Sequence, residues 1–257
     1  MGVPMLTGEE IEAFVEEGFV RLPGAFSRGT AERCRAELWE ATGCDPHDAA
    51  TWTEPVVRLG GFSTPPFREA ANTAALHEAY DQLAGRDRWR APRGLGTFPV
   101  RFPSGKEPGD DGWHLDAGFA GDGGEGRVSL RSRGRALLML FLLSDTGPAD
   151  APTRVRSGSH LDVPALLAGS GEEGREWFAL CGDAVPAGEG RTEVAATGNA
   201  GDVYLCHPFL VHAAQAHRGT VPRFLAQPPL EPAGLLDLTG ASPTPVERAV
   251  LRGLERH

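Results

Sequence analysis

The sequence predicts an α+β fold in which one mainly β core is preceded by helices and followed by a single helix. Helix start and stop signals dominate before residue 95, whereas short apolar runs separated by Gly, Pro, Asp and Ser clusters fill residues 95–230. Gly and Pro account for 34 and 21 of the 257 residues, which suits many short strands joined by turns. No linker or repeat divides the chain, so we expect one domain over residues 1–257. Its parts are a helical region (1–94), a β core (95–230) and a tail with a helix (231–257).

Capping residues mark where the helices begin and end. Thr7 with Glu10, and Thr244 with Glu247, form capping boxes, and Ser27 is an N-cap for a helix that a glycine would end. The helices predicted in this way span residues 7–15, 27–41, 71–83 and 163–168 and a final segment from 244 onward. The strands predicted from short apolar runs span residues 19–22, 56–59, 97–102, 137–143, 153–156, 192–196, 202–206, 210–214 and 223–227.

Composition and charge exclude several classes of function. The net charge is −10 and no basic stripe is present, so we expect no nucleic-acid partner and no anionic membrane surface as partner. The longest apolar run, residues 136–143, is too short to cross a bilayer. The four cysteines form no CxxC pair and no signal peptide is visible, so we expect a cytoplasmic protein with free thiols. The sequence leaves the oligomeric state open.

His114 and Asp116 are candidate metal ligands. They are two residues apart, and in extended backbone such residues project from the same face. One imidazole nitrogen and one carboxylate oxygen can then reach the same ion. The pair alone is also compatible with two ordinary polar surface residues.

A second histidine and an arginine complete the pattern further along the chain. His212 lies among apolar residues, and Arg223 follows it by eleven residues. Two neutral imidazoles and one carboxylate suit non-haem Fe(II) and leave open positions for a chelating cosubstrate and O₂. An arginine can clamp the far end of a dicarboxylate with two parallel hydrogen bonds. His207, beside a proline, remains an alternative to His212 as the distal ligand.

Four segments in this order resemble the phytanoyl-CoA dioxygenase-like family of Fe(II)- and 2-oxoglutarate-dependent oxygenases. They are WHLDAG around His114, DAPTRVRSGSH at residues 150–160, GDVYLCHPFLVHAA around His212, and Arg223. The resemblance implies a double-stranded β-helix, or jelly roll, with Fe(II) held by His114, Asp116 and His212. It also implies that 2-oxoglutarate chelates the iron, that Arg223 binds its distal carboxylate, and that O₂ converts it to succinate and CO₂.

Other residues receive weaker expectations from the same resemblance. Thr153 is expected to face the cosubstrate, and Arg101 and Trp113 to face the substrate, although Arg101 could equally serve as an ordinary partner for an acidic residue. The family often places a second polar cosubstrate contact just after the distal histidine, where this chain has Ala214. Related halogenases lack the carboxylate at the position of Asp116, so hydroxylation or desaturation is expected instead.

The expected activity is therefore a 2-oxoglutarate-dependent dioxygenase, with ascorbate as reductant in vitro, that acts on a small-molecule metabolite. An acyl-CoA is less attractive as a substrate because no basic cleft is evident. The alternative is a jelly-roll protein that binds metal and 2-oxoglutarate as a sensor without turnover, and Ala214 is the residue that favours it.

Overall fold

The longest apolar run forms β6 (Leu137–Leu142), the central strand of a five-stranded antiparallel sheet. The computed structural model describes residues 6–256. The sheet runs in the order β1 (Phe19–Leu22), β10 (Val203–Cys206), β6 and β12 (Leu225–Ala226), and β13 (Pro229–Leu230) also pairs with β6. Strands from both ends of the chain thus meet around one apolar segment from its middle.

Three smaller antiparallel sheets complete the β structure of the described part of the chain. One consists of β11 (His212–Ala213), β7 (Arg154–Arg156) and β9 (Glu193–Ala195). The other two are the pair β2 (Val56–Leu59) and β3 (Phe98–Arg101), and the group β4 (Phe119–Ala120), β5 (Gly126–Val128) and β8 (Arg175–Glu176).

β6 is apolar at every position because both of its faces are buried. Leu137, Met139 and Phe141 belong to the large apolar cluster that the helices cover. Leu138, Leu140 and Leu142 belong to a second cluster, shared with residues of β7 and β10. Side chains alternate between the two faces of a strand, so one uninterrupted apolar run can serve both clusters.

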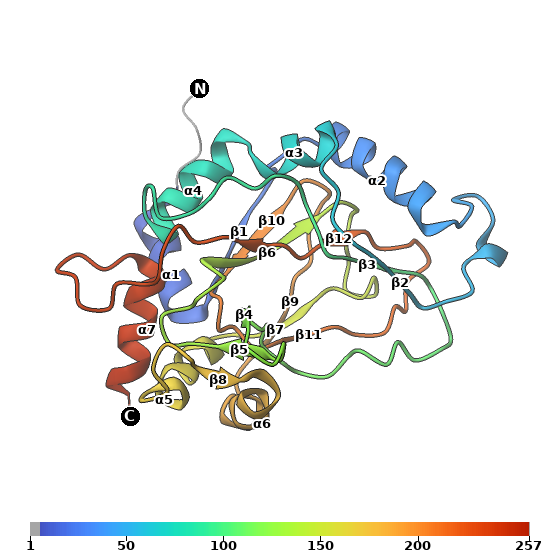
Figure 1. Cartoon of the computed structure of the whole chain (residues 1–257). Coiled ribbons are helices and arrows are strands. Elements are labelled where there is room, and N and C mark those ends of the chain that lie inside the picture. The colour runs from blue at the N-terminus through green and yellow to red at the C-terminus, as the bar shows by residue number, and fades with distance from the viewer. Residues whose placement is uncertain (1–5, 257) are drawn as a thin grey trace.

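Within residues 6–256, seven α-helices surround this β structure (Figure 1). In Figure 1, α2, α3 and α4 lie together along one side of the large sheet, and α5 and α6 lie beside the smaller sheets. The helices are α1 (Gly8–Glu17), α2 (Arg28–Thr42), α3 (Pro65–Ala71), α4 (Ala74–Ala84), α5 (Val163–Leu167), α6 (Trp177–Ala187) and α7 (Pro245–Glu255). Within residues 6–256, every helix is too short or too polar to traverse a bilayer.

The capping signals located the helix ends correctly in most places. Both capping boxes are present, and Gly18 and Gly43 end α1 and α2 in the left-handed conformation. The helix predicted over residues 71–83 is wrong at its start: α3 ends at Ala71 and α4 begins at Ala74, because the Thr73 side chain accepts a hydrogen bond from Leu76 N. The sequence prediction also omits α3, α6 and the short strands β4, β5, β8 and β13.

Helix α6 escaped prediction because its sequence, WFALCGDAVPA, contains both glycine and proline and has no clear polar face. The side chain of Glu176 caps it by accepting hydrogen bonds from Phe178 N and Ala179 N at 3.0 and 2.8 Å. Tertiary packing and this cap therefore outweigh a weak helical sequence.

Candidate metal centre

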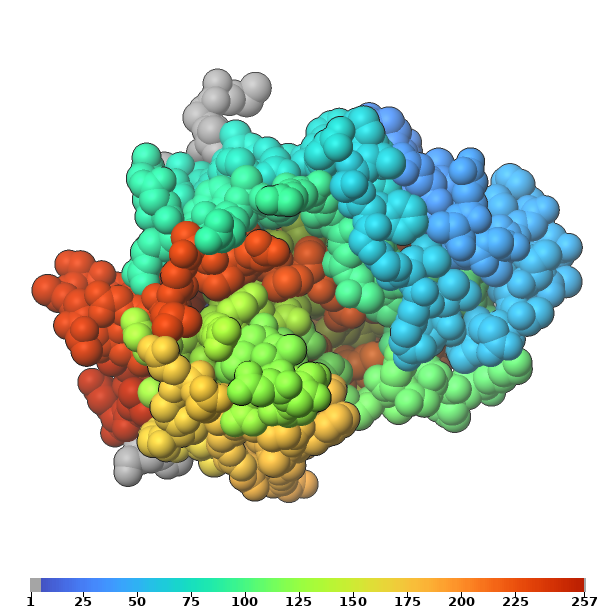
Figure 2. Space-filling view, in the orientation of Figure 1, coloured from blue at the N-terminus to red at the C-terminus, as the bar shows by residue number. Residues whose placement is uncertain are grey.

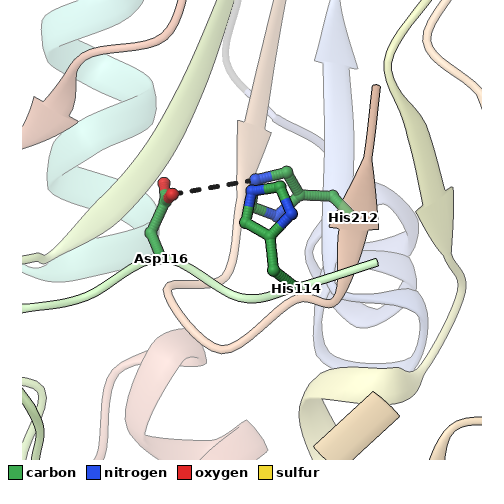
Figure 3. A group of neighbouring side chains, drawn as sticks. All are labelled: His114, Asp116 and His212. Carbon is green, nitrogen blue, oxygen red and sulfur yellow. Dashed lines mark ion pairs between the residues drawn. The ribbon is translucent and has the colours of Figure 1, made fainter. Parts of the chain in front are cut away.

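His114, Asp116 and His212 come together at the edge of the β11–β7–β9 sheet (Figure 3). His114 and His212 are opposite each other in an antiparallel bridge, in which His114 N donates to His212 O at 2.9 Å and His212 N donates to His114 O at 2.8 Å. Residues paired in this way project from the same face, and the two imidazole centroids are 4.5 Å apart. The bridge joins the two halves of the pattern, which are almost one hundred residues apart in sequence.

Both histidines are oriented for metal binding through Nε2. Nδ1 of His114 lies 2.8 Å from Gly112 O, and Nδ1 of His212 lies 3.0 Å from Leu210 O. A carbonyl only accepts, so each Nδ1 carries the proton and each Nε2 keeps its lone pair. Binding of a metal-ligating histidine to such an outer carbonyl fixes both tautomer and ring orientation.

The three donor atoms fit one ion. They all lie within 4.8 Å of one another, and His212 Nε2 is 3.9 Å from Asp116 Oδ1. With metal–ligand bonds of about 2.1 Å, two atoms on one ion are at most about 4.2 Å apart, so small side-chain rotations suffice. Among residues 6–256, this is the one group of three or more potential ligands.

The local environment favours the protonation states of Asp116 and His212 that bind a cation. Burial alone would raise the pKa of the Asp116 carboxyl, but His212, Arg135 and His114 outweigh it, so the pKa lies below its usual value. Burial lowers the pKa of His212, although Asp116 opposes the shift. The carboxyl is thus ionised and the imidazole neutral at neutral pH, which is the protonation state that a metal requires.

Helix α6 supports the segment between the first two candidate ligands. Leu115 is fully buried, and its carbonyl accepts a hydrogen bond from Trp177 Nε1. The Trp177 ring also meets the His114 ring edge to face, with centroids 6.4 Å apart. On the other side, Arg135 Nη1 lies 3.2 Å from Asp116 Oδ2, and Arg135 Nε donates to Ala117 O at 2.8 Å. Both contacts restrict the position of the His-Leu-Asp segment.

A cavity of about 300 Å³ opens beside the three candidate ligands. Figure 2 shows a hollow between the blue-to-cyan segment that carries β2 and the green segment that follows β3. The cavity is lined by Arg58, Thr97, Pro99, Arg101, Asp110, His114, Asp116, Arg135, His212, Ala214 and Gln227. Two hollows of about 610 Å³ lie elsewhere, but neither contains His114, Asp116 or His212, so chemistry rather than size identifies the site.

The two predicted arginines lie side by side behind this cavity. Arg101 and Arg223 are opposite each other in an antiparallel bridge, and each is 2% exposed. Arg101 lines the cavity and pairs with Asp110 at 2.8 Å, so the acidic partner that the sequence left open is present. Arg223 donates to the carbonyls of Ala151 and Pro99.

Other predicted residues lie in different surroundings. Within residues 6–256, the cavity lining includes neither Thr153, which is buried, nor Trp113. Instead, the guanidinium groups of Arg154 and Arg156 form cation–π contacts with the Trp113 ring, at 4.8 and 4.3 Å from its centroid.

His207, the alternative distal ligand, is in the apolar core. Its Nδ1 accepts a hydrogen bond from Phe209 N at 3.2 Å, and its Nε2 lies 3.2 Å from Val246 O. Its ring packs against His160, with centroids 4.8 Å apart. The structure therefore places His212, and not His207, beside His114 and Asp116.

Sequence reasoning missed three residues that contact the site: Asp110, Arg135 and Trp177. Asp110 precedes the His-Leu-Asp segment in a run of Gly and Asp that reads as an ordinary loop. Arg135 belongs to a short basic stretch, and Trp177 begins the unpredicted α6. Each reaches the site only through tertiary folding, so no local pattern could have identified them.

Comparison with known sequences identifies the family. The sequence profile of the family described as phytanoyl-CoA dioxygenase (PhyH) matches residues 14–225, which is most of the chain. The chain belongs to the phytanoyl-CoA dioxygenase family. This confirms the resemblance seen in the four motifs and makes the chain an oxygenase by family. No curated protein matches it.

Solved structures share the fold at low sequence identity. The carbocyclase SnoK from nogalamycin biosynthesis, described as non-heme and alpha-ketoglutarate dependent, is 19% identical with a TM-score of 0.56, over 88% of this chain and 85% of that one. HygX from Streptomyces hygroscopicus, solved with nickel and 2-oxoglutarate, is 22% identical with a TM-score of 0.55, over 87% and 86%. EctD from S. alaskensis, solved with 2-oxoglutarate and 5-hydroxyectoine, is 19% identical with a TM-score of 0.54, over 86% and 74%.

Proposed function

We propose that this member of the phytanoyl-CoA dioxygenase family is an Fe(II)- and 2-oxoglutarate-dependent dioxygenase that hydroxylates or desaturates a small-molecule metabolite. The convergence of His114, Asp116 and His212, with both Nε2 atoms free, carries the proposal. Two imidazoles and one carboxylate are the donor set of non-haem Fe(II) oxygenases, and they leave positions for a cosubstrate and O₂. Related folds have been solved with 2-oxoglutarate, which agrees with this cosubstrate.

The iron, when bound with 2-oxoglutarate and O₂, would supply the oxidative chemistry, in which the cosubstrate becomes succinate and CO₂ and a substrate C–H bond is oxidised. The protein itself would hold the iron and orient the groups that bind to it. His114, Asp116 and His212 would hold the ion on one face, and the buried Leu115 fixes the spacing between the first two. Asp116 supplies the only negative charge among the three ligands, and its presence favours hydroxylation or desaturation over halogenation.

Arg223 is the proposed anchor for the distal carboxylate of 2-oxoglutarate. It is buried, and its Nε has no hydrogen-bond partner within the described residues. A buried cation with an unused donor is costly unless an anion reaches it. The predicted contacts of Thr153 with the cosubstrate and of Trp113 with the substrate remain predictions.

The fold agrees with a double-stranded β-helix. The large sheet and the β11–β7–β9 sheet share an apolar cluster between them, and all strand pairings are antiparallel. We propose that residues 1–257 form a single oxygenase domain, with residues 95–230 as its jelly-roll core and residues 1–94 and 231–257 packed around it.

A small substrate fits the site better than a large anionic one. The cavity volume is about 300 Å³, at the lower end of the range for small-molecule sites. The net charge of the chain is −10, which opposes a polyanionic substrate such as an acyl-CoA. A natural-product intermediate or an amino-acid derivative is the proposed substrate class.

The test is anaerobic Fe(II) titration followed by measurement of succinate formed from 2-oxoglutarate in air with ascorbate. We expect one Fe(II) per chain and slow succinate release without substrate. Absence of iron binding would rule out the proposal. Iron and 2-oxoglutarate binding without turnover over a broad substrate panel would instead favour the sensor.

A further inference from the structure

Two guanidinium groups are buried next to each other beside the proposed metal site. Arg101 N donates to Arg223 O at 3.0 Å, and Arg223 N donates to Arg101 O at 2.8 Å. Residues that exchange both hydrogen bonds in an antiparallel pair project from the same face. The two side chains therefore enter one region, where the Asp110 carboxylate pairs with Arg101 and acts on Arg223 only through its charge.

Some buried nitrogen atoms of the two arginines lack hydrogen-bond partners within the described residues, and positive charge predominates in this region. Nε and Nη1 of Arg101 and Nε of Arg223 are buried and have no hydrogen-bond partner within the described residues. Burial lowers the pKa of Arg223 to about 9; the neighbouring Arg101 also lowers it, and Asp110 opposes the change. Within the described residues, Asp110 pairs with Arg101 but not with Arg223. Two adjacent buried cations with donors left over indicate a place where a further anion binds.

The position of the pair relative to the cavity indicates which arginine meets the ligand first. Arg101 lines the cavity together with His114, Asp116 and His212. Within residues 6–256, Arg223 is not part of that lining, and its Nη1 and Nη2 donate to the carbonyls of Ala151 and Pro99. A carboxylate that enters from the metal side would thus reach Arg101 before it reaches Arg223.

Asp110 occupies the part of Arg101 that such a carboxylate needs. Both Asp110 oxygens accept hydrogen bonds from Nη2 of Arg101, each at 2.8 Å. A guanidinium offers two edges for bidentate pairing, Nε with Nη2 and Nη1 with Nη2, so Nη2 belongs to both. Each edge uses one N–H of Nη2, and both Asp110 oxygens lie 2.8 Å from this nitrogen, so a ligand carboxylate that pairs with two nitrogens of Arg101 competes with Asp110 for Nη2.

Asp110 has a second partner to which it can remain bound. Its Oδ2 also accepts a hydrogen bond from Arg58 Nη2 at 2.5 Å. Arg58 is 56% exposed, and Arg101 is 2% exposed. When a ligand displaces Asp110, the Asp110 carboxylate can stay with the more solvated arginine.

We propose that Arg101 binds the distal carboxylate of 2-oxoglutarate together with Arg223, and that Asp110 occupies this place until the cosubstrate displaces it. The inference rests on the proposed function. It assigns to Arg101 the second polar contact that Ala214 cannot provide, and it directs Arg101 to the cosubstrate instead of the substrate. Asp110 then acts as an internal competitor that weakens cosubstrate binding.

The experiment compares two 2-oxo acids that differ in the distal carboxylate. 2-Oxoglutarate and 2-oxobutyrate are titrated calorimetrically, without O₂, into Mn(II)-loaded protein. The variants are Arg101→Lys, which retains a cation for Asp110 but has no bidentate edge, and Asp110→Asn, which removes the competing charge. Arg33→Lys is the matched control, because Arg33 lies on α2 and forms an exposed ion pair with Glu69 of α3.

We expect Arg101→Lys to weaken 2-oxoglutarate binding about tenfold or more, as for loss of a charge-assisted hydrogen bond, and to leave 2-oxobutyrate binding unchanged. Asp110→Asn should tighten 2-oxoglutarate binding and again leave 2-oxobutyrate unchanged. Arg33→Lys should behave as the parent with both ligands.

The possible failures are distinguishable. If the parent protein does not bind 2-oxoglutarate, the proposed function itself fails. If the parent binds it and Arg101→Lys binds it equally well, or weakens both ligands alike, Arg101 does not contact the distal carboxylate. Unchanged or weaker 2-oxoglutarate binding in Asp110→Asn overturns the competing role of Asp110. If Arg101→Lys does not fold, Asp110→Asn decides.

Discussion

Replacing Asp116 with alanine tests the metal centre most directly. The substitution removes one of the three proposed ligands and the only one that carries a negative charge. His114 and His212 keep their bridge and their Nδ1 hydrogen bonds to Gly112 O and Leu210 O, because none of these bonds involves the Asp116 side chain. The change therefore separates metal binding from the geometry that supports it.

The expected loss in iron affinity is large. Removal of an outer partner of a metal ligand costs about 10- to 100-fold in affinity. Loss of the ligand itself should exceed this, so we expect at least about a 100-fold weaker Fe(II) affinity, or about 2.7 kcal/mol. Succinate formation should fall below detection.

The expected change in stability is small. In the metal-free protein, Asp116 pairs with Arg135 at 3.2 Å, and the two side chains are 25% and 17% exposed. A pair of this kind contributes roughly 1 kcal/mol or less. The free energy of unfolding without metal should therefore change by about 1 kcal/mol at most.

The assay combines anaerobic Fe(II) titration with urea unfolding of the metal-free proteins. Asp122→Ala, which removes an exposed carboxylate from the turn between β4 and β5, is the control and should match the parent in both measurements. Parental iron affinity in Asp116→Ala would show that Asp116 is not a ligand. A variant that fails to fold would show that Asp116 is primarily structural.

Three further predictions concern the surroundings of the site and the core. Trp177→Phe, which removes the indole donor to the carbonyl between the first two ligands, should weaken Fe(II) affinity about tenfold; an unchanged titration would exclude this supporting role. Burial lowers the pKa of His207 to about 3 and that of His160 well below 6.5, so the unfolded chain binds more protons below pH 6.5. The free energy of unfolding should therefore fall as the pH drops from about 6.5, by up to about 1.4 kcal/mol per pH unit for each histidine. Urea unfolding at several pH values should show a shallower pH dependence for His207→Phe than for the parent. The control His47→Gln, at an exposed histidine, should keep the parental pH dependence. Glu247 is 1% exposed, pairs with a partly exposed arginine and caps α7. Glu247→Ala should therefore lower the free energy of unfolding by about 3 kcal/mol. A decrease below about 1 kcal/mol in urea unfolding would contradict this role.

Local signals determined the helix ends and the candidate ligands. The capping boxes of α1 and α7 lie where the sequence predicts them, because a cap depends on residues within one helical turn. The apolar run of β6 predicted a buried strand for a similar reason: burial on both faces leaves no polar position. The metal-ligand pattern was visible because a donor set depends on residue type, and the His-x-Asp spacing places two donors on one face.

The tertiary structure alone decided which distant residues meet. The family resemblance already favoured His212 over His207, but only the bridge to His114 places its side chain beside Asp116. Helix α6 formed against its weak local signal because packing and a single cap suffice once the rest of the fold is in place. Helix signals and donor types act over a few residues, whereas the pairing of Arg101 with Arg223 and Asp110 joins segments up to about 120 residues apart, which only the folded chain brings into contact.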